Sequence, residues 1–160
     1  MTIQIGDRVP NTTFIRVTAD GPQPVESDEF FAGRKVALFS VPGAFTPTCS
    51  AKHLPGYIEK ADELKAKGVD EVAGTAANDF FVMKNWGEAS GVGDKVTLLA
   101  DGNGAFPAAV GLTADMSKFG MGTRGQRFSM LVNDGVVEQL NVEGPGEFRV
   151  SSAEYMLESL

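Results

Sequence analysis

The sequence has only one cysteine, Cys49, and only one histidine, His53, among its 160 residues. A single cysteine rules out an intrachain disulfide, a bond typical of oxidising compartments, and therefore favours a cytoplasmic protein. One cysteine and one histidine also leave a tetrahedral metal ion two ligands short, with only carboxylates to complete the set. We therefore expect neither a disulfide framework nor a metal site.

Basic residues are scarce as well: Lys and Arg number 14 against 21 Asp and Glu, which gives a net charge of −7. Nucleic acids and anionic membranes are themselves negatively charged, so neither is an expected partner. No stretch approaches the roughly 20 apolar residues of a membrane-spanning helix. The first residues also lack the basic region and the apolar core of a secretory signal peptide.

What is present fits one domain spanning residues 1–160, because no repeat, low-complexity tract or linker divides the chain. Apolar runs predict buried strands, and apolar residues three and four apart predict helices. In chain order, the predicted elements are strand 34–41, helix 50–67, strand 69–75, a helix capped by Asn78 or Asp79 that ends near Ala89, strand 95–100, a short helix, strands 127–133 and 136–142 joined by Asp134-Gly135, and helix 151–160 capped by Ser151. This order predicts an α/β fold with a central mixed sheet flanked by helices.

Cys49 follows strand 34–41 and a loop rich in proline and glycine, at the start of the next helix. Active residues of such sheets gather where strands end and helices begin, and the N–H groups of a first helical turn favour a thiolate. A cation from elsewhere in the fold would add to this effect, but spacing alone does not locate it. The alternative is that Cys49 is a small buried hydrophobe, the commoner role of a lone cysteine.

His53 lies four residues after Cys49, on the same face of the predicted helix. It is either a base that accepts the thiol proton or a structural side chain at a turn kinked near Pro55. We favour the structural role, because no nearby carboxylate or amide would orient the ring for catalysis.

Pro42, Thr46 and Cys49 form the pattern P-x-x-x-T-x-x-C, which resembles the signature of the peroxiredoxins. The surrounding VPGAFTPTCS…HLPGY is similar to the type II, peroxiredoxin-5-like branch. Three further segments match that branch in the same order: 78–87, 98–101 and 127–130. The resemblance implies a thioredoxin-like fold and reduction of hydrogen peroxide and alkyl hydroperoxides without a cofactor.

The resemblance also implies a role for each residue of the site. The Cys49 thiolate attacks one peroxide oxygen and becomes a sulfenic acid. Arg127, which the resemblance supplies as the missing cation, stabilises both oxygens together with the Thr46 hydroxyl and the backbone N–H groups near Thr48 and Cys49. Pro42 shields the sulfur from bulk water.

The sequence departs from many type II members because it has no second cysteine. Gly74 stands where some members carry one, and 150–152 is Val-Ser-Ser where others do. The sulfenic acid is therefore expected to react with an external thiol, either glutathione with glutaredoxin or thioredoxin. The alternative is a peroxide-sensing module that does not turn over; a thiol–disulfide oxidoreductase is disfavoured because C-x-x-C is missing. By analogy with the branch we also expect a homodimer, with interface candidates 42–45, 80–86 and 111–120.

Overall fold

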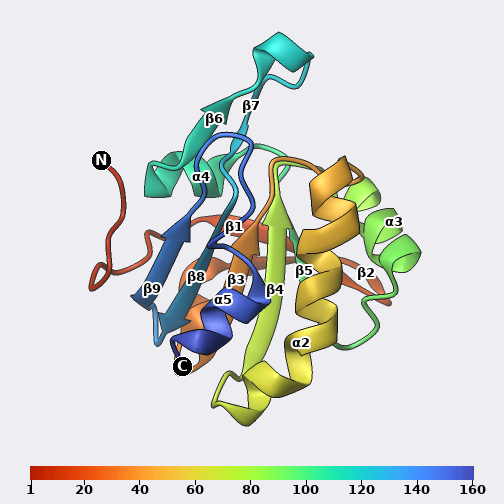
Figure 1. Cartoon of the computed structure of the whole chain (residues 1–160). Helices are drawn as coiled ribbons and strands as arrows, with labels where there is room; N and C mark the ends of the chain where they lie inside the picture. The colour runs from red at the N-terminus through yellow and green to blue at the C-terminus, as the bar shows by residue number, and fades with distance from the viewer.

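The computed structural model describes all residues, 1–160, and contains a seven-stranded mixed sheet with the strand order β2-β1-β5-β4-β3-β8-β9 (Figure 1). Strands β3, β4 and β5 are parallel, whereas β1, β8 and β9 run antiparallel to their neighbours. The strands of this sheet are β1 (Thr13–Thr18), β2 (Gly21–Glu26), β3 (Lys35–Ser40), β4 (Glu71–Ala76), β5 (Thr97–Ala100), β8 (Phe128–Asn133) and β9 (Val136–Val142). The predicted mixed sheet is confirmed.

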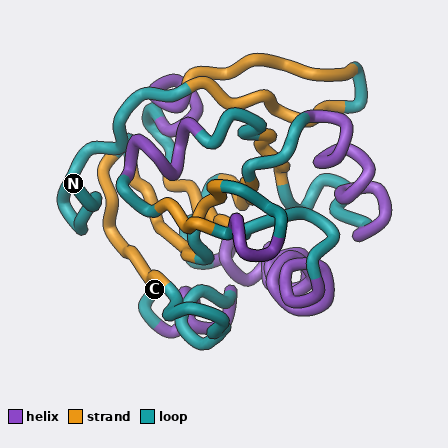
Figure 2. Tube along the Cα trace, turned by 90° about the horizontal axis from the view of Figure 1, so that it is seen from above, coloured by secondary structure: helices purple, strands orange, loops and turns teal.

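Helices lie on both sides of this sheet, as the view from above shows (Figure 2). The central strand β3 is buried on both faces: Ala37 and Phe39 belong to one core cluster, and Val36 and Leu38 to the other. This alternation follows from the period of two along a strand. The helices are α1 (Ser27–Phe31), α2 (Leu54–Ala66), α3 (Phe80–Ser90), α4 (Ala105–Val110) and α5 (Ala153–Glu158). None of the helices combines the length and the apolar character that a membrane span requires.

The helix expected after Cys49 begins differently from the prediction. Cys49–His53 forms a π-helical turn, and the α-helix α2 starts only at Leu54. Pro55 occupies the first turn of α2, directly after the π turn, so the irregularity precedes the proline. A π turn adds a residue to the helical turn and is often found at functional sites.

Two strand pairs lie outside the predicted elements. β1 and β2 form an antiparallel hairpin at one edge of the sheet. β6 (Thr113–Asp115) and β7 (Thr123–Gly125) form a small separate sheet, joined through a short 3₁₀ turn at Ser117–Phe119, that extends from one end of the molecule (Figure 1). The N-cap of the last helix also differs: Ser152, and not Ser151, accepts the hydrogen bond from Tyr155 N, at 3.1 Å.

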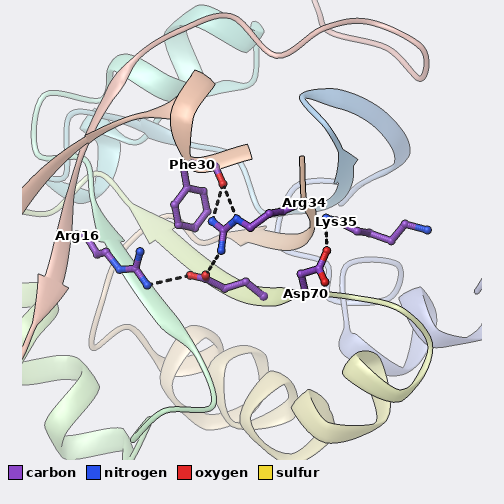
Figure 3. A network of polar contacts seen from close by, with 6 residues as sticks. Arg16, Phe30, Arg34, Lys35 and Asp70 are labelled. Carbon is purple, nitrogen blue, oxygen red and sulfur yellow. Dashed lines mark hydrogen bonds and ion pairs between the residues drawn. The ribbon is translucent and has the colours of Figure 1, made fainter. Parts of the chain in front are cut away.

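A cluster of charged side chains joins the sheet to α1 at the end where β3 and β4 begin (Figure 3). Glu71 forms ion pairs with both Arg16, at 3.4 Å, and Arg34. Arg34 also donates two hydrogen bonds to the Phe30 carbonyl oxygen, at 3.1 and 2.5 Å, and its guanidinium lies 4.8 Å from the Phe30 ring centre. These contacts tie β1, β4 and α1 together.

Candidate active site

Cys49 and Arg127 meet beyond the last residue of β3. The chain leaves β3 through the loop 41–48 and enters the π turn at Cys49, whose side chain is completely buried. β8 pairs antiparallel with β3, with Phe128 opposite Ser40, so the residue before β8 lies next to that loop. This pairing explains how residues separated by 78 positions come together.

The guanidinium of Arg127 bridges the thiol and the imidazole. Its Nη2 donates to Cys49 Sγ at 3.0 Å, and its Nη1 donates to His53 Nδ1 at 2.9 Å. A hydrogen bond from a fixed positive charge favours the thiolate over the thiol. The structure therefore places at Cys49 the cation that sequence spacing alone does not locate.

The contacts of His53 define its tautomer. A guanidinium only donates, so Nδ1 must accept; a carbonyl oxygen only accepts, so Nε2 carries the hydrogen that it donates to Ser151 O at 3.0 Å. Burial and then the nearby Arg127 lower the pKa of His53 to about 3, and the ring is therefore neutral at pH 7. Because the lone pair of Nδ1 is engaged by Arg127, the ring is not placed to take a proton from Cys49.

The structure extends the structural role that the sequence analysis favoured for His53. His53 lies at the end of the π turn, yet it connects Arg127 with the distant Ser151 and does not only brace the turn near Pro55. The Phe148 ring packs beside this pair, with its centre 5.0 Å from the His53 ring centre and 5.9 Å from Arg127 Cζ.

A cleft of about 520 Å³ opens above these residues and is lined by Pro42, Thr48 and Arg127 together with two segments from distant parts of the chain. One wall is the β6 strand and the turn that follows it, 113–119, and the other is 143–147. Pro42, Thr48 and Arg127 thus come together at the cleft, and Cys49 lies buried behind them.

Thr46 lies on the same loop, half-buried, and its hydroxyl donates to the Gly43 carbonyl at 2.7 Å. The proton of this hydroxyl is therefore committed, and the lone pairs of Oγ1 are left to accept a hydrogen bond. Two residues that the sequence analysis did not single out hold the loop. Arg124 Nη1 donates to the carbonyls of Pro42, at 3.4 Å, and Ala77, at 3.3 Å, and Asn78 Oδ1 accepts from Ala44 N at 2.9 Å.

Trp86 contacts the turn that carries Cys49. Its Nε1 donates to the Ser50 hydroxyl at 2.9 Å, next to Cys49, and the ring is almost fully buried. Because Trp86 is the only tryptophan in the chain, we expect its fluorescence to respond to changes at the cysteine turn. Nothing in its sequence context indicates this contact.

The comparisons with known proteins agree with this geometry. The Redoxin family model matches residues 4–157. Peroxiredoxin-2E-2, chloroplastic, of Oryza sativa subsp. japonica is 52% identical over 99% of this chain and 73% of its own length. This chain belongs to the peroxiredoxin family. Its fold is thioredoxin-like, as the resemblance implied, and the members of this family are thiol-dependent peroxidases.

Two solved peroxiredoxin structures are similar to this peroxiredoxin over nearly its whole length. The structure of reduced Prx3 in complex with H₂O₂ from Vibrio vulnificus has a TM-score of 0.94 and 51% identity, and the match covers 99% of both chains. The Plasmodium falciparum antioxidant protein, a 1-Cys peroxiredoxin, has a TM-score of 0.89 and 27% identity over 98% of both chains. With one cysteine, this peroxiredoxin fits a one-cysteine variant of the type II branch.

Gly74, where some type II peroxiredoxins carry a second cysteine, has no room for a side chain. It pairs with Phe39 across β3 and β4, and a Cβ at this position would lie 2.4 Å from the Phe39 ring. That ring stacks on Tyr57 with centres 4.3 Å apart and lies 5.0 Å from His53. The glycine is thus part of the aromatic packing beneath the active site.

Proposed function

We propose that this peroxiredoxin reduces hydrogen peroxide and alkyl hydroperoxides at Cys49. The observation that carries the proposal is the fork of Arg127, which already donates to the sulfur at 3.0 Å and borders the cleft through which a peroxide would enter. The thiolate attacks one oxygen, an S–O bond forms as the O–O bond breaks, and the leaving oxygen departs as hydroxide or alkoxide and takes up a proton. Cys49 becomes a sulfenic acid.

The other site residues have distinct roles in this proposal. Arg127 and backbone N–H groups near Thr48 and Cys49 stabilise charge that develops on the two oxygens. Thr46, whose own proton is held by Gly43, accepts a hydrogen bond from the peroxide O–H and so orients it. Pro42 borders the cleft and keeps bulk water from the sulfur.

An external thiol then completes the cycle. The sulfenic acid reacts with a thiol to form a mixed disulfide and water, and a second thiol releases the Cys49 thiol as the reductant becomes a disulfide. Cys49 is the only cysteine of the chain and is completely buried, which favours a small thiol that can enter the cleft. We therefore place glutathione with glutaredoxin first and thioredoxin second.

A peroxide-consumption assay with each reductant tests this function. We expect sustained turnover with at least one of them, and none with Cys49→Ser. Consumption of a single equivalent of peroxide with every reductant would overturn the proposal in favour of a peroxide-sensing module. Turnover with thioredoxin alone would reverse our order of reductants.

We further propose a cytoplasmic homodimer. A reducing cytoplasm returns Cys49 to its thiol form. Each of the three interface candidates carries one exposed phenylalanine: Phe45, Phe81 and Phe119, with 55%, 72% and 70% of the residue exposed. Sedimentation of the protein and of a Phe81→Glu variant tests the assembly. We expect a dimer that the substitution weakens, and a monomer at all concentrations would contradict it.

A further inference from the structure

The last loop of the chain, residues 143–151, holds a nearly buried carboxylate. We call this segment the C-terminal strap. Glu143 is 7% exposed, and its Oε2 accepts hydrogen bonds from Val150 N, Ser151 N and Ser151 Oγ at 2.9, 2.7 and 2.6 Å. Arg149 N donates to both carboxylate oxygens, at 2.9 and 2.8 Å. One side chain thus gathers four donors and closes the strap on itself.

The strap in turn supplies the partner of His53. The Ser151 carbonyl oxygen accepts from His53 Nε2 at 3.0 Å and from the Tyr57 hydroxyl at 2.9 Å. The opposite nitrogen of the ring accepts from Arg127, which donates to Cys49. Hydrogen bonds on either side of Ser151, joined through the covalent backbone of that residue, therefore connect the Glu143 carboxylate with the reactive sulfur.

The Glu143 side chain does not pair with Arg127, although the two residues are hydrogen-bonded through their backbones. It borders the same cleft as Arg127, and its backbone N donates to the Arg127 carbonyl at 3.0 Å. Its carboxylate, however, forms no ion pair with the guanidinium. Burial acts to raise the pKa of the Glu143 carboxyl, but the donors of Ser151, Arg149 and Val150 outweigh it, so the pKa lies below its ordinary value. The hydrogen-bond donors of the strap thus hold the Glu143 carboxylate without any contribution from the Arg127 guanidinium.

We propose that Glu143 is a positioning residue for peroxide reduction: by folding the strap around its carboxylate, it fixes the Ser151 carbonyl, which orients His53 and through it the guanidinium of Arg127. The inference rests on the role proposed above for Arg127. It does not make Glu143 a catalytic residue, because its carboxylate touches neither the sulfur nor Arg127.

The test compares Glu143→Gln with Glu158→Gln. Both substitutions are isosteric and remove one negative charge from the C-terminal part of the chain. Glu158 is exposed at the end of α5, lies outside the cleft and forms no ion pair. In Glu143→Gln the amide replaces an acceptor by a donor opposite N–H groups, so the strap loses part of its anchor.

Two rates are measured on the reduced enzyme by the fluorescence of Trp86: oxidation by hydrogen peroxide and alkylation by iodoacetamide. Both reactions need the Cys49 thiolate. Only peroxide oxidation also needs the leaving oxygen of the O–O bond to be held in line with the sulfur. Because misplacement of a reacting group by about 1 Å can cost about a hundredfold in rate, we expect Glu143→Gln to slow peroxide oxidation about ten- to a hundredfold. Alkylation should change less than about threefold, and Glu158→Gln should leave both rates within about twofold.

Ser151→Ala gives a second, milder disturbance in case Glu143→Gln does not fold. It removes one donor to Glu143 and keeps the backbone carbonyl, so we expect peroxide oxidation to slow by about two- to fivefold. Peroxide oxidation of the folded variants within about twofold of the unsubstituted enzyme, or equal slowing of both reactions, would overturn the inference. If the unsubstituted enzyme consumed only a single equivalent of peroxide, or if Cys49→Ser kept its turnover, the proposed function itself would fail, so the two failures are distinguishable.

Discussion

Arg34 and Arg127 lie at opposite ends of β3 and are held by opposite kinds of partner. At the end where β3 begins, Arg34 and Arg16 share the carboxylate of Glu71, and Arg34 is further fixed by the Phe30 carbonyl and ring (Figure 3). At the other end, Arg127 is held by a neutral imidazole, and its second nitrogen is directed at Cys49.

The difference lies in where the positive charge is neutralised. At Arg34 a carboxylate neutralises it permanently, and the result is a tie between strands and helix. At Arg127 the only side chains within hydrogen-bond distance are neutral His53 and Cys49, so no carboxylate balances the charge. An arginine without a carboxylate partner is a means of stabilising charge that arises during a reaction.

The largest effect should follow from Arg127→Lys. A lysine ammonium lacks the planar fork that reaches the sulfur and the imidazole together, so we expect the rate of peroxide oxidation to fall about 10²- to 10³-fold. The midpoint of thermal unfolding should change little. Stopped-flow fluorescence and calorimetry measure the two quantities, and a variant that lost stability but kept its rate would invalidate the contrast between the two arginines.

The second prediction concerns the loss of folding stability at low pH. The pKa of His53 is about 3 in the folded protein against an ordinary value of 6.5, so the unfolded chain binds the extra proton between these values. Stability should therefore be complete above pH 6.5 and decrease as the pH falls toward 3. From pH 7 to pH 5 the loss is about 2 kcal/mol.

Denaturant unfolding at several pH values checks this slope, with His53→Gln as the control that cannot titrate. Among the groups that face His53, Tyr57 has a raised pKa and Glu143 a lowered one, so both titrate outside this window. An equal loss in the control would show that another group is responsible.

At the opposite end of β3, Glu71→Gln should act on stability alone. It leaves two partly buried guanidinium groups without their shared carboxylate, so we expect a loss of about 1–2 kcal/mol in the free energy of unfolding. The peroxide rate should match that of the unsubstituted enzyme. A slowed reaction would mean that the two ends of β3 are coupled.

The smallest effect should come from Arg16→Gln. This side chain is the more peripheral partner of Glu71, at 3.4 Å and one-third exposed, while Arg34 remains to pair with the carboxylate. We expect a loss of about 0.5 kcal/mol or less. Urea unfolding alongside Glu71→Gln measures it, and equal losses in the two variants would assign the stabilisation to Arg16.

The elements that the sequence predicted are those with strong local signals. The apolar run before Val41, the Asp134-Gly135 turn and the helix capped by Asp79 all appear close to their predicted positions. β1 and β2 escaped prediction because their stability comes from pairing with each other and with β5, and β2 carries two prolines that suit only an edge strand. β6 and β7 are too short, at three residues each, for any periodicity.

The active-site residues likewise divide into those with a strong local sequence signal and those without one. Pro42, Thr46 and Cys49 form a local motif, whereas Arg127 came only from the family resemblance because the pairing of β8 with β3 brings it to the cysteine. The orientation of His53 depends on a backbone carbonyl 98 residues away. A backbone group has no residue-type signal, so no reading of side chains could have predicted it.

The lack of space at Gly74 restricts the introduction of a second cysteine at this position. A second thiol at that position would press its Cβ into the Phe39 ring, and through that ring into Tyr57 and His53. Residues 39 and 74 therefore constrain one another, and a cysteine could be accommodated only together with a smaller residue in place of the phenylalanine. The interior packing of the protein thus disfavours a second cysteine at residue 74.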